Sequence, residues 1–339
     1  MADAYAAAGV DIAAATRAKE LMAAAVRATH GPAVLAGMGA FGGCFDLEVA
    51  APGATGILVA STDGVGTKTL VATAMGRYDS VGQDLVNHCV NDILVQGATP
   101  LFFLDYVAAA RLEPDHVAAI VGGVATACQA LGCALLGGET AEMPDVYAPS
   151  GFDLAGTLVG IVTREAMLPR PDIAPGDVVL ALPSTGLHTN GYSLARRIVA
   201  QAGASYHDRP AILGGPSLGE ALLAVHRCYL TEVQVLRQAV TLKGLAHITG
   251  GGVFDNLPRA LPAGMGATLT RGSWPIPPIF RYLVEQGQLQ EQEAYHALNM
   301  GLGMLAIIAP DAVTAALAAC PEACLVGAVR ATAGVELCD

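Results

Sequence analysis

The segment from Asp63 to Lys68 combines residue types that suit phosphoryl chemistry. It reads Asp-Gly-Val-Gly-Thr-Lys and follows the apolar run at 57–60, which predicts a short strand. The carboxylate of Asp63 is a potential Mg²⁺ ligand. Gly64 and Gly66 expose backbone amides, and Lys68, one of only three lysines in the chain, supplies a cation. The order differs from the Gly-Lys-Ser/Thr of a Walker A loop, and an ordinary Asp-Gly turn is the alternative.

A second group of polar residues recurs at helical spacing between residues 80 and 96. Apolar residues fill most of this segment, which predicts a buried helix ending at Gly97. The polar positions share one helix face: Asp84, Asn87, His88, Asn91 and Asp92. This polar stripe contains no Lys, Arg or Glu, the usual residues of a solvated face. We expect it to face a cavity or an interface, with its carboxylates balanced by a metal, a cation or hydrogen bonds; a solvated face is the alternative.

Two further carboxylates follow another short apolar run. Residues 133–136 predict a strand, and the sequence Gly-Gly-Glu-Thr-Ala-Glu comes directly after it. Ligands tend to bind at such strand ends in α/β layers, so Glu139 is a third candidate Mg²⁺ ligand beside Asp63 and Asp92. Glu142 has an ordinary alternative role as the cap of a turn.

Three glycines near the N-terminus, Gly37, Gly39 and Gly42, fit the pattern Gly-x-Gly-x-x-Gly. A dinucleotide fingerprint needs a strand before this pattern and a helix after it, whereas a predicted helix at 11–28 precedes it here. A loop that closes over an anionic ligand suits the segment, because backbone N–H groups approach phosphate closely where no side chain intervenes. A flexible hinge is the alternative.

The second half of the chain contains two loops with similar chemistry. Residues 184–193 read Ser-Thr-Gly-Leu-His-Thr-Asn-Gly-Tyr-Ser between a predicted strand and a predicted helix. Residues 249–252 read Thr-Gly-Gly-Gly in the same kind of position. Hydroxyls, an imidazole, an amide and bare backbone N–H groups at a helix start suit a phosphate. An ordinary turn is the alternative for either loop taken alone.

Alternating helices and strands must position these motifs. In the first half we expect helices at 11–28, 80–96 and 114–131 and strands at 57–60, 101–107, 133–136 and 153–163. In the second half we expect strands at 178–182, 245–248, 266–270, 303–308 and 323–328 and helices at 191–202, 218–239, 277–286 and 290–298. The Pro-rich stretch from Leu168 to Asp177 continues neither element type, and it predicts a boundary between domains 1–168 and 169–339. The alternation favours α/β or α+β layers.

Composition excludes several classes of protein. The chain has 339 residues, enough for two domains, and 30 acidic against 18 basic residues give a net charge of −12. A chain this acidic is a poor candidate for nucleic-acid binding. Its longest uncharged run, Val117 to Gly138, is broken by glycines and predicts a buried helix and strand rather than a membrane span. No signal peptide pattern and no zinc-type cysteine spacing are present, so we expect a cytoplasmic protein with reduced thiols.

Taken together, these segments resemble the phosphoribosylformylglycinamidine cyclo-ligase family, also called aminoimidazole ribonucleotide synthetases. The resemblance runs almost from end to end, through residues 8–12, 62–68, 84–92, 97–106, 137–144, 188–194, 249–252 and 299–304. The spacing Asp92-x4-Gly97-Ala98-x-Pro100 is shared with a wider superfamily that includes selenophosphate synthetases and thiamine-phosphate kinases. The segments at 137–144 and 188–193 narrow the resemblance to the cyclo-ligases. Alanines at 13–14 and Ser61 replace glycines common in the family, and neither change removes a functional side chain.

The resemblance implies a two-domain α+β subunit. It implies an N-terminal sheet domain that binds ATP and pairs in a homodimer, and a C-terminal α/β domain that contributes to the substrate site. It also implies the reaction, in which ATP activates the amide oxygen of formylglycinamidine ribonucleotide and a nitrogen then closes the ring to give aminoimidazole ribonucleotide, ADP and phosphate. Mg²⁺ is implied as a cofactor, and a monovalent cation is an additional candidate.

The motifs and the resemblance together assign the site residues. We expect Mg²⁺ to be bound by Asp63, Asp92 and Glu139. We expect ATP to contact Gly37, Gly39, Gly42, Asp63, Gly64, Gly66, Thr67, Lys68, Asn91, Asp92 and Glu139. We expect the substrate to contact His188, Asn190, Thr249, Gly250, Gly251 and Gly252. Lys68, Asp92 and His188 are the expected catalytic residues, with His188 acting as an acid or base or donating a hydrogen bond only.

Two other functions stay open at this point. A kinase or synthetase of the same superfamily would use ATP on a different acceptor. A nucleotide-binding or maturation protein without catalysis would bind ATP and dimerise but show no turnover.

Overall fold

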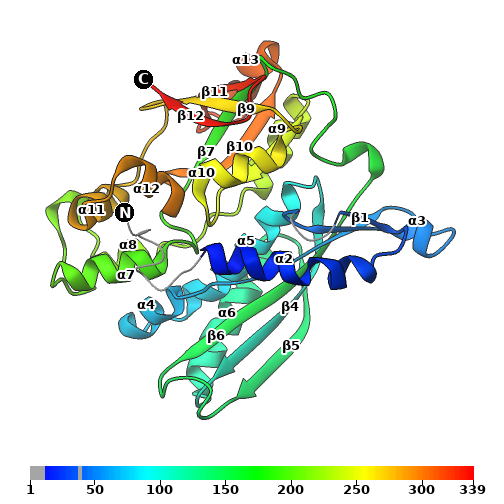
Figure 1. Cartoon of the computed structure of the whole chain (residues 1–339). Coiled ribbons are helices and arrows are strands. Elements are labelled where there is room, and N and C mark those ends of the chain that lie inside the picture. The colour runs from blue at the N-terminus through cyan, green and yellow to red at the C-terminus, as the bar shows by residue number, and fades with distance from the viewer. Residues whose placement is uncertain (1–11, 37–39) are drawn as a thin grey trace.

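The computed structural model describes residues 12–36 and 40–339, which fold into two domains (Figure 1). Each domain contains one six-stranded mixed sheet with helices packed against it. The helix that carries the polar stripe, α5 (Asp79–Leu94), packs on strands of the first sheet and also contacts a strand and a helix of the second domain. The α+β architecture predicted from the sequence is therefore confirmed.

The N-terminal sheet has the strand order β1-β2-β3-β6-β4-β5. Its strands are β1 (Val34–Ala36), β2 (Gly43–Asp46), β3 (Ile57–Gly64), β4 (Thr99–Ala109), β5 (Ala134–Glu142) and β6 (Phe152–Val162). The helices of this domain, besides α5, are α2 (Ile12–Ala28), α3 (Leu47–Ala50), α4 (Lys68–Met75) and α6 (Pro114–Ala130). Strands β4 and β5 run parallel because α6 crosses over between them, and the other pairs are antiparallel.

Helices α5 and α6 cover one face of this sheet, and glycines allow them to approach closely. A Cβ atom on Gly82 of α5 would lie 2.1 Å from the carbonyl oxygen of Ile120 in α6. A Cβ atom on Gly156 of β6 would lie 2.2 Å from the ring of Phe103 and 2.9 Å from Leu85 of α5. The backbone of α5 is thus fixed between the sheet and α6, and its polar stripe points toward the other domain.

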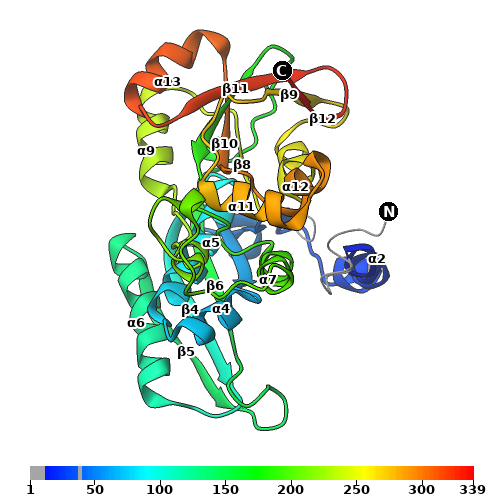
Figure 2. The same cartoon turned by 90° about the vertical axis from the view of Figure 1, so that its left-hand side faces the viewer.

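The C-terminal sheet has the strand order β12-β9-β11-β7-β10-β8 (Figure 2). Its strands are β7 (Val178–Pro183), β8 (Gly244–His247), β9 (Gly266–Thr270), β10 (Leu302–Ile308), β11 (Cys324–Arg330) and β12 (Gly334–Cys338). Its helices are α7 (Tyr192–Gln201), α8 (Leu218–Leu222), α9 (Leu230–Ala239), α10 (Gly252–Asn256), α11 (Pro278–Gly287), α12 (Glu291–Ala297) and α13 (Val313–Ala319). Short 3₁₀ segments occur at Arg164–Ala166, Ala211–Leu213, Leu257–Ala260 and Pro310–Ala312. Residues 163–177 connect the two sheets, and the predicted boundary falls within them.

The structure corrects three expectations about secondary structure. Strand β3 continues to Gly64 and β5 continues to Glu142, so Asp63 and Glu139 lie inside strands rather than after them. Strands β1, β2 and β12 and helices α3, α4, α10 and α13 were not expected. The single helix expected at 218–239 is interrupted, because residues 223–229 leave the helical conformation between α8 and α9. The interrupted segment, residues 223–229, binds the polar stripe of α5.

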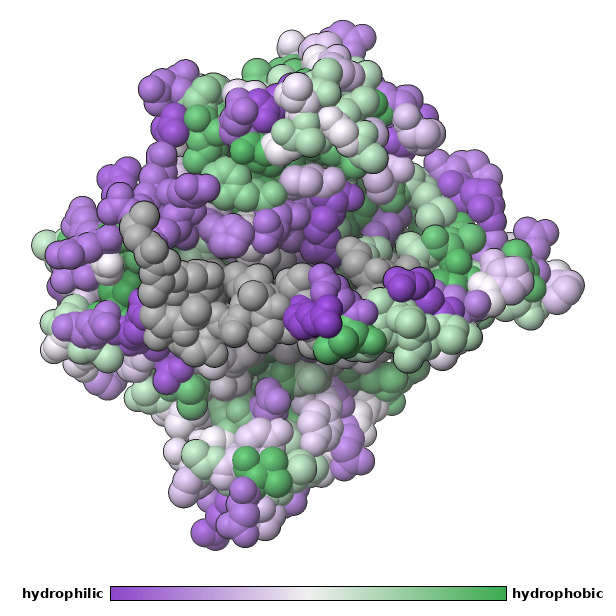
Figure 3. Space-filling model, in the orientation of Figure 1, coloured by the Kyte–Doolittle hydropathy of each residue, from purple (hydrophilic) through white to green (hydrophobic). Residues whose placement is uncertain are grey.

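The N-terminal sheet also has exposed hydrophobic side chains. In β4 the exposed Leu104 follows the buried Phe103, and the exposed Leu136 lies on β5. Figure 3 shows hydrophobic residues among hydrophilic ones on the surface of this domain. Within the ranges described, the chain contains no helix that is both long enough and apolar enough for a membrane span.

Candidate active site

The polar stripe of α5 is buried against residues 223–229 of the C-terminal domain. Asp84 Oδ1 accepts a hydrogen bond of 2.6 Å from the backbone N–H of His226, and Asn87 Nδ2 donates one of 2.7 Å to the carbonyl oxygen of His226. Asn91 makes two more bonds to backbone groups of the same segment. These side chains satisfy backbone groups that an uninterrupted helix would satisfy by itself. The expected interface is confirmed, and the solvated-face alternative is wrong.

Lys68 lies inside the protein rather than at an open phosphate site. Its Nζ atom lies 2.7 Å from Asp84 Oδ2 and donates hydrogen bonds to the carbonyl oxygens of His188 (3.0 Å) and Ala224 (2.9 Å). The side chain is 0% exposed, and these three oxygen atoms surround its ammonium nitrogen. The structure therefore does not support the expected contact of Lys68 with phosphates.

Asp63 and Asp92 both lie near Nε2 of the His88 ring. His88 Nε2 is 2.9 Å from Asp63 Oδ2 and 3.6 Å from Asp92 Oδ2. Burial by itself lowers the pKa of His88, but the two carboxylates outweigh burial and raise the pKa to about 9. His88 is therefore a cation at neutral pH. Burial tends to raise the pKa of Asp63, yet the charge and hydrogen bond of His88 hold that pKa below its ordinary value.

Two histidines of the C-terminal domain, His247 and His226, form a series of contacts that begins at Asp92. His247, at the end of β8, has Nδ1 2.8 Å from Asp92 Oδ1, and its Nε2 lies 3.1 Å from Nε2 of His226. Asp92 Oδ2 also accepts a hydrogen bond of 3.2 Å from Ser61. Burial lowers the pKa of His247, and burial together with neighbouring histidines lowers the pKa of His226 well below its ordinary value. Both rings are thus neutral hydrogen-bonding groups, in contrast to His88.

A cavity of about 510 Å³ opens beside Asp63 and Asp92. Both domains line it: Ala40, Phe41, Gly43, Ala60, Ser61, Thr62, Asp63, His88, Asp92, Asn190, Thr249 and Arg259. The guanidinium of Arg259 stacks on the Phe41 ring with 3.5 Å between its central carbon and the ring centroid. Carboxylates, a guanidinium, an amide and a hydroxyl in one cavity can bind a polyphosphate together with a divalent cation.

The two C-terminal loops contribute unequally to this cavity. Asn190 and Thr249 line it, as the sequence predicts for substrate contacts, and Gly250 lies close to Asn190. Gly251 and Gly252 are buried at the start of α10, with φ values of 87° and 60° that favour glycine.

His188 lies outside the cavity. Its side chain is 1% exposed, and its ring stacks on His226 with the centroids 4.0 Å apart. Burial lowers the pKa of His188 well below its ordinary value. The expected role of His188 as an acid, a base or a donor to the substrate is therefore not supported by its position.

Glu139 does not meet the other two acids. Asp63 lies on β3 and Glu139 on β5, with β6 and β4 between these strands in the sheet. Neighbouring strands are about 4.8 Å apart, so three spacings place the two residues roughly 14 Å apart. Within one chain they cannot share a metal ion. The expectation fails because β6 and β4 lie between β3 and β5 in the sheet, and the sequence does not reveal this strand order.

The remaining predicted nucleotide contacts within the described residues have different surroundings. Gly64 donates its backbone N–H to Asp63 Oδ1 (2.7 Å), Gly66 is exposed with φ 56°, and the Thr67 hydroxyl lies 3.2 Å from that of Ser193. Asn91 binds the 223–229 segment and does not line the cavity. Gly42 is buried beside β3, while Gly37 and Gly39 lie outside the described residues.

Sequence reasoning missed Arg259, His226 and His247. Arg259 lies seven residues after Gly252, and nothing in its spacing from that loop marked it. His226 lay within a predicted helix, and His247 within a predicted strand that was given no role. The position of His247 two residues before Thr249 of the Thr-Gly-Gly-Gly loop was the one available signal for it.

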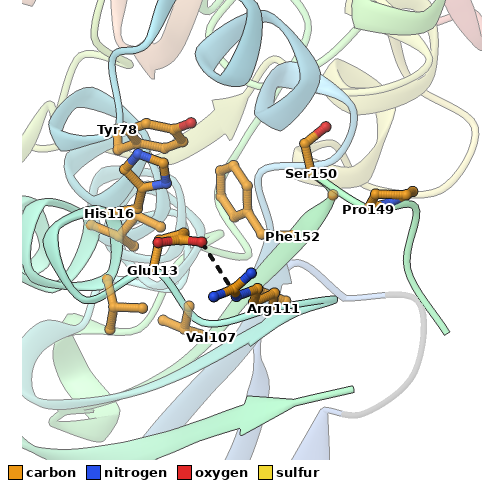
Figure 4. Close-up of a pocket in the computed structure, with 12 residues that line it drawn as sticks. Tyr78, Val107, Arg111, Glu113, His116, Pro149, Ser150 and Phe152 are labelled. Carbon is orange, nitrogen blue, oxygen red and sulfur yellow. Dashed lines mark ion pairs between the residues drawn. The ribbon is translucent and has the colours of Figure 1, made fainter. Parts of the chain in front are cut away.

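A second cavity, of about 290 Å³, lies near the N-terminus of α6 (Figure 4). Tyr78 and His116 stack there with ring centroids 4.0 Å apart, and Phe152 lines another side. Arg111 and Glu113 form an exposed ion pair of 3.6 Å beside it. None of the predicted site residues lines this cavity, so the polar cavity at Asp63 and Asp92 is the better candidate for an active site.

Comparison with protein families supports the two-domain organisation. Residues 42–162 match the family described as "AIR synthase related protein, N-terminal domain", and residues 174–338 match its C-terminal counterpart. Among solved structures, Escherichia coli HypE, a hydrogenase maturation protein, is similar with TM-score 0.63 and 21% identity over 95% of this chain and 93% of that one. A thiamine-monophosphate kinase from Stenotrophomonas maltophilia K279a gives TM-score 0.64 and 20% identity over 92% and 93%. Fold and domains thus define an AIR synthase related protein.

Curated relatives identify the group within this class. A phosphoribosylformylglycinamidine cyclo-ligase of Geobacillus kaustophilus is 50% identical over 92% of this chain and 90% of its own length. The enzyme of the same name from Shouchella clausii is 46% identical over 99% of both chains. The chain belongs to the phosphoribosylformylglycinamidine cyclo-ligase family.

Proposed function

We propose that this protein closes the imidazole ring of aminoimidazole ribonucleotide, using formylglycinamidine ribonucleotide and ATP and releasing ADP and phosphate. Family membership supports this reaction. The structural observation that carries the proposal is that Asp63 and Asp92 line one polar cavity with Arg259, Asn190 and Thr249. A metal-bound nucleotide requires carboxylates for the metal, and the N-terminal domain supplies them. The nucleotide phosphates and the ribonucleotide acceptor require cationic and neutral polar groups, and the C-terminal domain supplies these.

The donors in the cavity fit Mg²⁺. This ion is usually bound by one or two carboxylates, with phosphate oxygens and waters completing its shell. Asp63 and Asp92 supply two carboxylates, and the Asp63 side chain is 41% exposed toward the cavity that it lines. When bound, Mg²⁺ would neutralise charge on the phosphate oxygens during transfer. Glu139 is left out of this ligand set.

Residues of the chain itself would hold the reactants. Arg259 would supply a cation for the phosphate oxygens, and its contact with the Phe41 ring would limit the movement of the guanidinium group. Asn190 and Thr249 offer an amide and a hydroxyl to the acceptor. Because both domains contribute, closure of the cavity around both reactants would exclude water and align the amide oxygen with the γ-phosphate.

The chemical reason for using ATP is the poor leaving ability of an amide oxygen. Transfer of the γ-phosphoryl group to that oxygen forms a new P–O bond and breaks the bond to ADP. The ring-forming nitrogen then attacks the activated carbon, loses a proton, and phosphate departs with the former amide oxygen. Such transfer depends mainly on positioning and charge neutralisation.

Three further features belong to the proposal. Similar folds occur in HypE in complex with ATP and in a thiamine-monophosphate kinase with AMPPCP, which supports nucleotide use by this fold. The exposed Leu104 and Leu136 on the N-terminal sheet support a homodimer through that sheet. A cytoplasmic location is consistent with free cysteines throughout the described residues.

One assay tests the reaction. The purified protein is mixed with Mg²⁺–ATP and formylglycinamidine ribonucleotide, and the aminoimidazole product is measured colorimetrically, in potassium and in sodium buffers. We expect product in a one-to-one ratio with ADP. ATP consumption without this product would instead indicate a kinase or synthetase with another acceptor, and ATP binding without turnover would indicate a maturation-type role.

A further inference from the structure

The carboxylate of Asp92 is held from the opposite domain. Asp92 is part of α5, whereas its partner His247 ends β8 of the C-terminal sheet. A carboxylate can only accept a hydrogen bond, so Nδ1 of His247 carries the proton in the 2.8 Å contact with Oδ1. The orientation of Asp92 thus depends on where the C-terminal domain places this ring.

The His247 ring is fixed by His226. Their Nε2 atoms are 3.1 Å apart, and Nδ2 of Asn91 lies 3.2 Å from the same Nε2 of His226. Because the one ring proton of neutral His247 is on Nδ1, the proton between the two Nε2 atoms belongs to His226. Both side chains are 0% exposed, so water cannot replace either partner.

His226 in turn has little freedom to move. Its backbone N–H and carbonyl are bound by Asp84 and Asn87 of α5. Its ring Nδ1 lies 3.3 Å from the hydroxyl of Thr189, and the ring face stacks on His188. Each polar atom of His226 therefore has a fixed neighbour, and the ring can support His247 in one orientation.

We propose that His226 and His247 are positioning residues for Asp92, and that they set the carboxylate orientation with which it binds the metal–nucleotide complex. The inference rests on the proposed role of Asp92 as a metal ligand. Hydrogen-bond partners of metal ligands orient the ligand atoms, and their loss typically weakens metal binding about 10-fold to 100-fold. Through these two histidines the docking of the C-terminal domain becomes a condition for metal binding in the N-terminal domain.

Paired substitutions distinguish positioning from simple packing. The amide nitrogen of Asn falls near the place of histidine Nδ1, and that of Gln near the place of Nε2. His247→Asn therefore keeps the donor to Asp92, whereas His247→Gln misplaces it. For His226 the functional and the impaired variant are exchanged. The amide nitrogen in His226→Gln reaches Nε2 of His247, whereas that in His226→Asn does not. Simple packing predicts no such reversal between the two positions.

The measurement is the affinity for Mn²⁺ in the presence of AMP-PNP, obtained from the electron paramagnetic resonance signal of free Mn²⁺ with the full-length protein. We expect His226→Asn and His247→Gln to weaken Mn²⁺ binding about 10-fold to 100-fold, and His226→Gln and His247→Asn to stay within about threefold of the parent protein. Urea unfolding of all four variants accompanies the titration, and we expect similar midpoints within each pair.

The variant Asp92→Asn distinguishes failure of the proposed metal role of Asp92 from failure of the proposed positioning role of the histidines. Unchanged Mn²⁺ affinity in Asp92→Asn would remove the proposed metal role itself. If Asp92→Asn weakens binding but the two members of each histidine pair behave alike, the positioning role is overturned while the metal role stands. If all four histidine variants fail to fold, the positioning role is also overturned, because the histidines would then be needed for packing alone.

Discussion

The ammonium nitrogen of Lys68 lies 2.7 Å from Oδ2 of Asp84, and neither side chain is exposed to solvent. The lysine belongs to the segment that the sequence marks for phosphate binding, and the aspartate belongs to the polar stripe of α5. Their pairing joins the two segments inside the protein. Because Lys68 also binds two carbonyl oxygens of the C-terminal domain, the pair contributes to domain docking rather than to an open anion site.

Replacement of Lys68 by Met should therefore act on stability. It leaves Asp84 as a buried carboxylate without its cation, and the free energy of unfolding should fall by about 3–5 kcal/mol in urea titrations. The double variant Lys68→Met/Asp84→Leu removes both charges and should recover a large part of this loss. A Lys68→Met protein of parental stability that no longer binds ATP would contradict this view and restore the phosphate role.

The close contact of α5 with α6 makes a second prediction. Gly82→Ala places a methyl group 2.1 Å from the backbone oxygen of Ile120, which neither helix can avoid without moving. We expect a loss of about 1–3 kcal/mol in the free energy of unfolding. Gly122→Ala, on the contacted helix α6, is the matched control: no atom lies within 4 Å of its new methyl group, and it should be neutral or slightly stabilising. Equal effects of the two changes would argue against a close approach of the two helices at Gly82.

The spacing of apolar and polar residues predicted the order of most helices and strands, and it predicted that the polar face of α5 is buried. Polar residues at helical spacing, with no Lys, Arg or Glu among them, correctly indicated that Asp84, Asn91 and Asp92 are buried. Burial of a helix face can be predicted in this way because it requires a periodic pattern within one segment. Periodicity cannot specify partners that come from distant segments. The contacts of α5 with residues 223–229 depend on a break in a predicted helix, and tertiary hydrogen bonds override local helical preference there.

Site prediction was limited for the same reason. Asp63 and Asp92 could be selected because each has a carboxylate that can bind Mg²⁺, whereas the residues directly beside it do not. Lys68 and His188 carry equally suggestive chemistry, but they are turned inward by packing between domains. Arg259 was missed because its position at the cavity results from the path of α10 and the following 3₁₀ segment, which no short motif encodes.

Arg259 provides a test of nucleotide binding. Arg259→Ala removes a cation from the cavity and should weaken ATP binding about 10-fold to 100-fold, as expected for a charge-assisted hydrogen bond to phosphate. Binding is measured by isothermal titration calorimetry with Mg²⁺–AMP-PNP. Arg281→Ala, an exposed arginine on α11, is the control and should bind like the parent. Parental affinity in Arg259→Ala would remove this residue from the phosphate site.

The exposed strands of the N-terminal sheet test the proposed homodimer. Leu136 is 64% exposed on β5, and Leu136→Glu places a charge on the surface that we expect to pair. Size-exclusion chromatography with light scattering should show a dimer for the parent chain and a shift toward monomer for this variant. Leu325→Glu, at a 45% exposed position in the other sheet, should stay dimeric. A monomeric parent chain would contradict the proposal directly.

The proposed function depends above all on Asp63 and Asp92 binding a metal–nucleotide complex together in the cavity between the domains. The sharpest test is calorimetric titration of AMP-PNP into the parent protein, Asp63→Asn and Asp92→Asn, each with Mg²⁺ and with EDTA. We expect Mg²⁺-dependent binding in the parent and loss of the Mg²⁺-dependent part in both variants, with unfolding transitions showing that the variants are folded. Mg²⁺-dependent binding of parental strength in either folded variant would show that the two carboxylates do not hold the metal together.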